Sequence, residues 1–508
     1  MLPIDHLFRA AASWPDRIAV DAPGESLSYR ALAERVAVLA ATFQARDQDP
    51  DGRIGICAHN TLTNLIAMLA VQAAGRCWIA LNPRNGREEL DGFVDLSRPS
   101  LIVADEDCLD RFTPPAAGLI LGATERPSEA ADTVAGLLTA HAGKRPEPAS
   151  NDLSHIAAVK LTGGSTGKPK AVMQSLRCWN AVTVSQILAI GLTAKDVTLL
   201  AAPITHGSGQ YILPTLAVGG RLVLIDRPRP ADILDAFETR GVSTVFLPPT
   251  MIYMLLAEPG AGERRYPALR HLIYAGAPMR AERIIEARAV FAGAIETSYG
   301  QAEAPQIMAY QRAEDFAEEA NLGAVGFPTS LTRLAVMDAE NRLLPQGEAG
   351  EIVAAGDLLF SGYLENPDET AAVLQDGWLR TGDLGAFDET GRLFIRGRAR
   401  DVIITGGFNV YPGDVERALG RHPAVHECTV FGVEDDKWGE RVEAAVELKP
   451  GAEATPESLI AFVKQTLDSI KAPKSVAIMV DLPRSAIGKV GRAEAKHAAL
   501  AARVAVTR

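Results

Sequence analysis

The sequence predicts an α/β protein with a large N-terminal domain and a smaller α+β C-terminal domain. A chain of 508 residues is too long for a single hydrophobic core. Short apolar runs alternate with amphipathic stretches at the spacing of βαβ units, in two separate regions. A polar break at residues 397–401 precedes a compact mixture of helices and strands. We therefore expect one domain over residues 1–399 and a second over 400–508.

The first region contains a helix with a clear start signal. Ser28 is a suitable N-cap, and the apolar residues after it recur on one helical face. A second helix is expected at 60–74, where Gly75 would form the C-cap. Short apolar runs between and after these helices predict buried strands at 54–58, 78–81 and 101–104.

The second region repeats the alternation after a variable connection at 122–150. Its strands and helices predict a second doubly wound subdomain, and β-runs with glycine-rich turns at 330–396 predict a small β-barrel. The expected strands are 197–201, 222–225, 242–247 and 272–275, and the expected helices are 232–239 and 280–289.

The last hundred residues predict a compact α+β domain. Helices are expected at 412–419 and 456–467, and strands at 428–431 and 476–480.

Composition excludes several classes of protein. The net charge of -12 argues against nucleic acid as a partner, because phosphate backbones require a basic surface. No apolar run approaches the ~20 residues of a membrane span, and no signal peptide is visible. Five dispersed cysteines without a C-x-x-C pair are typical of reduced thiols and predict no metal site. We expect a cytoplasmic protein without a membrane span, and a homodimer is left open.

The most informative stretch runs from Leu161 to Ala171. It holds three glycines, three hydroxyl residues and two lysines between two apolar segments. Glycines allow backbone N–H groups to surround an anion, and the hydroxyls and lysines add donors and charge. The interpretation is a loop that wraps a polyphosphate. A surface turn is the alternative, since the same residue types form turns.

A Walker-type P-loop is excluded at this position. The pattern G-x-x-x-x-G-K-[ST] requires Ser or Thr after Gly167-Lys168, where the chain has Pro169. It also requires Gly where Thr162 stands.

Several polar clusters follow predicted strands, at the edge where open α/β sheets bind ligands. Each cluster taken alone is more simply a turn or a solvated surface group. They are Thr205-His206-Gly207, Ala275-Gly276-Ala277-Pro278, Tyr299-Gly300-Gln301-Ala302-Glu303, Thr381-Gly382-Asp383, Gly397-Arg398, Gly406-Gly407 and Pro483 to Lys489.

Taken in order, these motifs resemble the adenylate-forming superfamily of acyl-CoA synthetases, peptide-synthetase adenylation domains and luciferases. The resemblance covers nearly the whole chain. It implies an enzyme, an AMP-forming acid–thiol ligase, that uses ATP, Mg²⁺ and coenzyme A on a small carboxylic acid. It makes residues 1–399 the adenylation domain and residues 400–508 a mobile domain.

The resemblance also implies site residues. Catalysis would involve Lys489, His206, Thr166 and Glu303, and Glu303 with Thr166 would hold Mg²⁺. Nucleotide and CoA contacts would come from Thr162, Gly163, Gly164, Ser165, Thr166, Gly167, Lys170, Gly276, Ala277, Pro278, Tyr299, Gly300, Gln301, Ala302, Asp383, Arg398, Lys489, Gly406, Gly407 and Trp438.

Three positions depart from the family pattern. Ala171 replaces a usual Gly at the end of the loop, and Ala302 replaces a usual Thr before the acidic residue. Arg400 stands at the hinge, where Asp or Lys is common. Each change leaves the charged groups of the motifs in place.

The acceptor and the acid are less specified. An adenylation domain that loads a carrier protein is one alternative, and a non-catalytic nucleotide-binding relative is another. The stretch 204–208 lacks the carboxylate that would hold an amino group, and no carrier-domain motif follows residue 489, which favours a stand-alone CoA ligase. A neutral pocket predicts an aromatic or medium-chain monoacid. Its candidate residues are His206, Gly209, Tyr274, Ala275, Gly276, Gln301, Ala302, Pro305 and Ile307.

Overall fold

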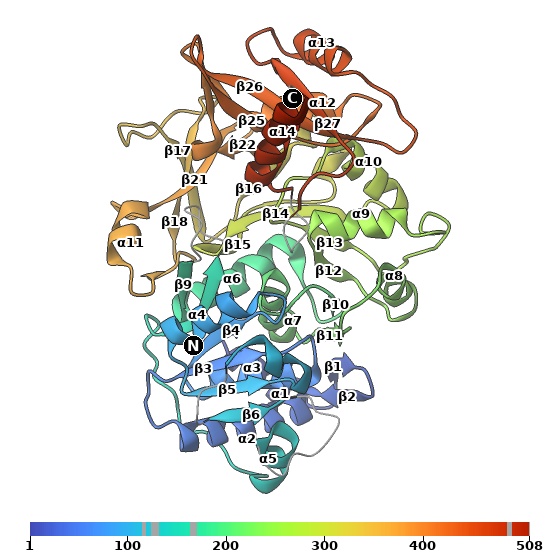
Figure 1. The fold of residues 1–508 in the computed structure, drawn as a ribbon. Coiled ribbons are helices and arrows are strands. Elements are labelled where there is room, and N and C mark those ends of the chain that lie inside the picture. The colour runs from blue at the N-terminus through green and yellow to red at the C-terminus, as the bar shows by residue number, and fades with distance from the viewer. Residues whose placement is uncertain (114–117, 123–131, 163–169, 485–489, 507–508) are drawn as a thin grey trace.

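The structure is a computed structural model that describes residues 1–113, 118–122, 132–162, 170–484 and 490–506. Within these ranges the chain forms a large N-terminal domain and a smaller C-terminal domain, which lies at the top of Figure 1. Both mix helices with strands, so the predicted α/β class is confirmed. Among the described residues, no helix is long and apolar enough to cross a membrane.

The largest sheet has 14 strands among the described residues and changes character along its length. On one side the pairing is parallel, through β1, β11, β10, β12, β13 and β14, and only β2 pairs antiparallel there, with β1. The strands from β15 onward pair antiparallel. In spatial order the sheet runs β17(Thr332–Met337), β18(Gly350–Gly356), β21(Trp378–Phe387), β22(Leu393–Arg398), β16(Ala324–Pro328), β15(Ala304–Gln311), β14(Ile295–Gln301), β13(His271–Tyr274), β12(Thr244–Leu247), β10(Val197–Leu200), β11(Arg221–Leu224), β1(Ile18–Ala22), β2(Glu25–Ser28), with β20(Leu374–Gln375) paired to β21.

The second sheet, in the part of the chain that the structure describes, has eight strands and lies in the lower half of Figure 1. Its strands are β19(Gly362–Tyr363), β9(Lys170–Ser175), β8(Ile156–Thr162), β4(Cys77–Leu81), β3(Arg53–Cys57), β5(Leu101–Ala104), β6(Leu119–Leu121) and β7(Asp132–Thr133), in that spatial order.

The two doubly wound subdomains are confirmed as sheets, but they exchange strands. The first strands of the chain, β1 and β2, join the large sheet through β11. Strands β8 and β9, which flank the predicted phosphate loop, form a hairpin in the second sheet. Asn60 ties the subdomains together: its amide donates to Leu200 O and Ala202 O and accepts from Ile204 N.

Local signals placed most helices. Ser28 accepts from Ala31 N at 3.2 Å at the start of α2, as predicted. Helix α3 begins at Leu62 with Thr61 as its cap, not at Asn60, because Asn60 is engaged across the subdomain contact. The helices of this domain are α1(Asp5–Ser13), α2(Tyr29–Arg46), α3(Leu62–Ala73), α4(Arg87–Ser97), α5(Val134–Ala140), α6(Leu176–Gln186), α7(Ile212–Ala217), α8(Pro230–Thr239), α9(Pro249–Ala257), α10(Ala281–Val290) and α11(Pro367–Val373).

Short helical turns connect some of these elements. They are η1(Glu106–Arg111), η2(Ile187–Gly191), η3(Gly207–Tyr211), η4(Asp315–Ala317), η5(Glu319–Asn321) and η6(Ala399–Asp401).

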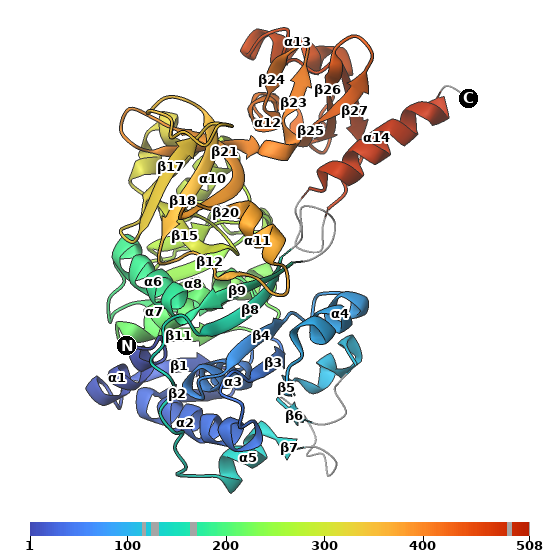
Figure 2. The ribbon, with the colours of Figure 1, turned by 90° about the vertical axis from the view of Figure 1, so that its left-hand side faces the viewer.

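The predicted small barrel at 330–396 is not confirmed. The described strands of this region form an antiparallel extension of the large sheet, because β16 pairs with both β15 and β22. Figure 2 shows this extension between the parallel strands and the C-terminal domain.

In the described part of the C-terminal domain, a five-stranded sheet packs with three helices, and its core is apolar and separate from those of the N-terminal domain. The domain contacts the N-terminal domain through Arg280, whose Nε lies 3.9 Å from Glu427 Oε1. Its elements are β23(Ile403–Thr405), β24(Phe408–Val410), α12(Pro412–Gly420), β25(Val425–Asp435), β26(Gly439–Leu448), α13(Pro456–Thr466), β27(Ser475–Met479) and α14(Arg492–Val506). The predicted boundary at 399–400 falls in η6 and stays a prediction.

Candidate active site

Three of the polar clusters predicted at strand ends meet, those at 299–303, 381–383 and 397–398, and the best-defined contact joins β14 to the antiparallel strands. The Tyr299 hydroxyl donates to Asp383 Oδ2 at 2.7 Å, and Arg398 Nε lies 2.7 Å from Asp383 Oδ1. Asp383 and Arg398 are direct cross-strand partners on β21 and β22. Tyr299 and Asp383 are 7% and 6% exposed. The carboxylate is therefore held by two donors in fixed positions.

Burial and charge keep Tyr299 protonated. Its pKa is raised well above the ordinary value, first by burial and then by the Asp383 carboxylate. A protonated hydroxyl can only donate to the carboxylate it faces, so the Tyr299–Asp383 contact is fixed in direction.

A second network surrounds Glu303, in the turn between β14 and β15. The Tyr363 hydroxyl donates to Glu303 Oε1 at 2.8 Å. Lys170 lies over the Tyr363 ring, 5.0 Å from its centre, and forms an ion pair with Glu369 of α11. The pKa of Tyr363 is raised by burial and by Glu303. This network joins the start of β9 to the end of β14, two segments far apart in the sequence.

The region between these networks is shaped by close backbone packing. A Cβ on Gly300 would lie 2.6 Å from the backbone of Gln306, so only glycine fits there. Gln301 Nε2 donates to Thr381 O at 3.4 Å, which brings the turn after β14 against β21. Gly276 follows β13, is exposed, and has a φ of +83°. Ala277 and Pro278 continue this turn.

His206 ends the turn between β10 and η3 and is exposed, with Thr205 Oγ1 3.0 Å from its Nδ1. The next residue, Gly207, faces an aromatic wall. A Cβ there would lie 2.6 Å from the Phe246 ring and 2.9 Å from Gln306 Oε1.

Three side chains that sequence reasoning missed complete this wall. Tyr211 and Phe246 stack with ring centres 5.6 Å apart. Gln306 Nε2 donates to the Tyr211 hydroxyl at 3.2 Å, from a backbone with a φ of +65°. A positive φ at a non-glycine residue marks strain held by the surroundings. Periodicity alone gives no signal for these contacts, because the three residues come from different strands and turns.

The predicted pocket residues are not all brought together. Tyr274 is buried in a separate hydrophobic cluster, where its ring centre lies 6.4 Å from that of Phe316. Its side chain does not form part of the aromatic wall. Ile307 is fully buried and belongs to the same hydrophobic cluster as Tyr211 and Phe246. Ala275 also lies in that cluster while its neighbour Tyr274 does not, since neighbouring strand residues point to opposite faces.

Other predicted residues lie in the C-terminal domain. Gly406 and Gly407 form the turn between β23 and β24, with φ of +58° and +84°. Trp438 is 44% exposed and covers Gly406: a Cβ on Gly406 would be 2.8 Å from its ring. Arg400 Nε lies 3.6 Å from Asp401 Oδ1, and Asp401 also pairs with Arg492 of α14.

Part of the predicted site lies outside the described residues. Thr162 ends β8 and Lys170 begins β9, and their backbones pair across the hairpin. The predicted loop residues Gly163, Gly164, Ser165, Thr166 and Gly167, together with Lys489, fall outside the described ranges.

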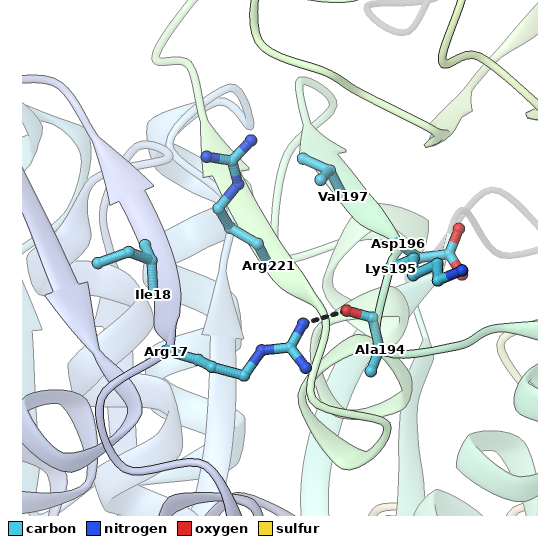
Figure 3. Close-up of a pocket in the computed structure, with 7 residues that line it drawn as sticks. All are labelled: Arg17, Ile18, Ala194, Lys195, Asp196, Val197 and Arg221. Atoms are coloured by element: carbon cyan, nitrogen blue, oxygen red, sulfur yellow. Dashed lines mark hydrogen bonds between the residues drawn. The ribbon is translucent and has the colours of Figure 1, made fainter.

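A pocket at the opposite edge of the large sheet is not part of this site (Figure 3). It is lined by residues at the amino-terminal ends of β10, β11 and β1, among them Arg17, Asp196 and Arg221. The Arg17 guanidinium donates to Ala194 O across it. Ligands of parallel sheets bind at the carboxyl ends, so this pocket is separate from the strand-end clusters.

Two family profiles match the chain. The profile of the AMP-binding enzyme matches residues 7–364, and that of the AMP-binding enzyme C-terminal domain matches residues 414–489. The chain belongs to the AMP-binding enzyme family. The predicted resemblance to the adenylate-forming superfamily is thereby confirmed.

Individual relatives agree with this assignment. A medium/long-chain-fatty-acid–CoA ligase, FadD8 of Mycobacterium tuberculosis, is 33% identical over 90% of this chain and 83% of its own. A feruloyl-CoA synthase of Amycolatopsis is 33% identical over 96% of this chain and 97% of its own. The solved structure of the amide bond synthetase McbA from Marinactinospora thermotolerans superimposes with a TM-score of 0.87 at 28% identity, covering 97% of this chain and 99% of that one.

The predicted enzyme class, an AMP-forming acid–thiol ligase, is confirmed by these CoA-ligase relatives. Enzymes of that class use ATP, Mg²⁺ and coenzyme A, as predicted. The described residues offer groups of the kinds that such ligands require: Asp383 is a buried carboxylate held by two donors, Glu303 is a carboxylate of the type that Mg²⁺ prefers, and Gly276 is exposed backbone with a positive φ.

Proposed function

We propose that this chain is a carboxylate–CoA ligase for a monocarboxylic acid, aromatic or of medium chain length. The observation that carries the proposal is the meeting of two networks on one strand and its turn. Tyr299 and Arg398 both bind Asp383, and Glu303, four residues after Tyr299, binds Tyr363, whose ring lies against Lys170. The groups proposed to bind the sugar and the phosphates thus meet at the end of β14 and the turn after it.

In the first half-reaction, an oxygen of the acid forms a bond to the α-phosphorus of ATP, and the bond to the leaving pyrophosphate breaks. The products are acyl-AMP and pyrophosphate. Both reactants are anions, so positioning and charge neutralisation account for most of the rate. Mg²⁺ supplies charge neutralisation on the phosphates when it is bound.

The residues of this chain would divide the work. Asp383 and Arg398 hold the ribose, and Tyr299 with the turn 276–278 encloses adenine. Lys170 and the loop residues Ser165 and Thr166 hold the phosphates, with Glu303 and Thr166 toward Mg²⁺. Lys489 neutralises charge on the acyl-phosphate group as it forms.

In the second half-reaction, the CoA sulfur forms a bond to the acyl carbon and the bond to AMP oxygen breaks. The thiol proton leaves with solvent or a base, and acyl-CoA and AMP are released. We propose that the C-terminal domain rotates about Arg400 between the two steps, so that Lys489 withdraws and the Gly406–Gly407 turn approaches. Glycines at both positions leave a narrow path for pantetheine.

The acid is proposed from the aromatic wall. Tyr211, Phe246 and Gln306 are neutral, and the wall holds no Lys or Arg that would pair with a second carboxylate. The relatives that act on a fatty acid and on ferulate also take monoacids. Transfer to a carrier protein is the second candidate function. Measurement of AMP release in the presence of free CoA distinguishes the two, because a carrier-loading enzyme releases little AMP with free CoA.

A pyrophosphate-release assay with a panel of acids tests the proposal. Benzoate-like and medium-chain monoacids should give a higher kcat/KM than malonate or amino acids, and addition of CoA should yield acyl-CoA. Preference for malonate or an amino acid would overturn the acid assignment, and failure to release pyrophosphate with any acid would overturn the activity.

A variant sharpens the test of the acid. Phe246→Ala removes one ring of the wall, so the ratio of kcat/KM for an aromatic acid to that for an aliphatic acid should fall several-fold, since a pocket contact of this size is worth about 1–3 kcal/mol. The two acids serve as each other's control within one protein. An unchanged ratio would remove Phe246 from the pocket.

A further inference from the structure

Three potential metal ligands meet at the carboxyl ends of β3 and β5, away from the candidate active site. They are His59, Asp107 and Cys108, and the Cys57 thiol lies beside that of Cys108. One ligand atom each from His59, Asp107 and Cys108 lies within 4.8 Å of the others. The Cys108 thiol also forms hydrogen bonds with Cys57 and with His59.

The topology of the sheet explains why they meet. Cys57 ends β3, with His59 two residues later, and Asp107 and Cys108 lie in η1, just after β5. Strand β3 has β4 on one side and β5 on the other, so the connections after β3 and β4 leave in opposite directions. Ligands of open α/β sheets bind at such a switch point.

Backbone contacts hold the two segments in register. Asp105 N donates to Cys57 O, and His59 N donates to the buried Asp105 carboxylate at 3.0 Å. The positions of the four side chains are thus fixed by the strand ends and not by a flexible loop.

The burial of the cluster suits a bound ion with an entry path. Cys57 and Cys108 are fully buried, whereas the side chains of His59 and Asp107 are 18% and 49% exposed. A divalent cation supplies the positive charge that lets buried thiols ionise.

The nearest charges partly balance the cluster. Arg227 Nη1 lies 3.1 Å from Asp107 Oδ2, and its Nε lies 3.1 Å from Asp226 Oδ2. Two thiolates and one carboxylate around a divalent cation leave one negative charge and Asp226 adds another, so Arg227 offsets one of the two. A charged residue that orients a ligating carboxylate is the usual surrounding of a metal site.

We propose that His59, Asp107 and Cys108, with the neighbouring Cys57 thiol as the fourth donor, form a binding site for a divalent metal of borderline softness, with Zn²⁺ as the best match. Two sulfurs, one imidazole and one carboxylate fit its tetrahedral preference. The site joins the ends of β3 and β5. Through Arg227, which follows β11, it also reaches the large sheet. Its role is to stabilise the contact between the two subdomains, and the cysteine spacing in the sequence gives no sign of it.

Metal titration of the tag-free full-length protein tests the proposal. After removal of metals with a chelator, Co²⁺ should bind with one ion per chain and show thiolate-to-cobalt charge-transfer absorption. Zn²⁺ should displace it and raise the thermal midpoint of the N-terminal domain. Cys108→Ser and His59→Gln should each weaken binding at least about tenfold, the lower end of the loss seen for disturbed metal sites.

Cys77→Ser is the matched control. Cys77 is a buried thiol of the same sheet, but it begins β4 opposite Arg53, at the other end from Cys57. It should bind Co²⁺ like the parent. If Cys108→Ser does not fold, His59→Gln carries the test, because His59 is partly exposed.

Two results would overturn the proposal. One is Co²⁺ absorption without a thiolate contribution, or equal affinity in the parent and the His59→Gln variant. The other is a protein that takes up no metal and instead forms a Cys57–Cys108 disulfide with a mild oxidant, which would make the pair a redox element.

Discussion

The two domains present their candidate functional groups in opposite ways. In the N-terminal domain, Tyr299 and Asp383 are almost fully buried and fixed by hydrogen bonds. In the C-terminal domain, Gly406 and Gly407 are exposed, and Phe408 and Trp438 beside them are 57% and 44% exposed.

This difference suits a protein that serves two half-reactions. Groups that bind the nucleotide throughout are best held rigid before binding, because positioning is then complete at the moment of reaction. Groups needed in only one step are best carried on a unit whose surface stays free until it moves. We therefore expect variants of the C-terminal domain to affect one half-reaction and variants of the N-terminal network to affect both.

The largest effect is expected for Lys489→Ala. Loss of a positive charge that acts while the acyl-phosphate bond forms should slow adenylation by roughly 10²–10³-fold, the scale for one transition-state stabiliser. Thioester formation from pre-made acyl-AMP should stay near normal. Single-turnover kinetics of each half-reaction make the comparison, and equal slowing of both would contradict the two-orientation mechanism.

Gly407→Leu should show the reverse selectivity. The side chain would fill the proposed pantetheine path and slow thioester formation by on the order of 100-fold, with adenylation unchanged, since misplaced reactants cost about that much. Because Gly407 has a φ of +84°, strain alone must be excluded. Gly451→Leu, at an open turn of the same domain with a φ of +75°, is the matched control and should leave both steps intact.

Arg400→Pro addresses the pivot itself. A proline fixes φ at the proposed hinge, so it should spare adenylation and block transfer, again to about 100-fold. Rapid-quench measurement of acyl-AMP, which should accumulate, makes the check. Normal transfer in a folded variant would place the pivot elsewhere.

The sequence predicts local features of both domains well. The Ser28 cap, the helix after it and the strand ends at 275–278 and 299–303 follow from short-range periodicity and turn chemistry, and each lies where expected. Those signals depend on neighbours in the chain and need no tertiary information.

What the sequence left unpredicted depends on distant pairings. Strands β1 and β2 join the large sheet through β11, some two hundred residues away. Tyr363, whose hydroxyl binds Glu303, comes from β19, a strand of the second sheet. The cluster at Cys57 and Cys108 forms because two strand ends are adjacent in space. No periodic pattern encodes which strand lies next to which, so these contacts required the structure.

Asp383→Asn tests the rigid side of the comparison. The change removes the charge that Tyr299 and Arg398 bind, and hydrogen bonds to charged groups contribute about 1.5–3 kcal/mol. We expect kcat/KM for ATP to fall by about 10–100-fold. In contrast to the C-terminal variants, acyl-AMP binding should weaken in both half-reactions. A loss confined to one step would contradict the idea that this network serves throughout.

Glu303→Gln asks whether the second network is a metal site or only a structural contact. If the carboxylate holds Mg²⁺, the Mg²⁺ concentration for half-maximal adenylation should rise about tenfold, the scale of a disturbed metal site. Tyr363→Phe is the control, since it removes the hydroxyl that binds Glu303 but leaves the carboxylate. It should shift the Mg²⁺ requirement less. An unchanged Mg²⁺ dependence in Glu303→Gln would make the carboxylate structural.

The smallest effect is expected for Trp438→Ala, and it separates two roles for an exposed ring. Trp438 covers Gly406, whose N–H donates to Trp438 O at 2.8 Å, so the ring supports the turn. If the ring also stacks on the adenine of CoA, its loss costs about 1 kcal/mol, the lower end for base stacking, and the KM for CoA rises roughly fivefold. Pantetheine lacks the nucleotide, so its KM should not change. A variant that loses affinity for CoA and pantetheine alike would show that Trp438 only shapes the Gly406–Gly407 turn. Adenylation should be normal in either case, because the ring lies on the domain that acts in the second step.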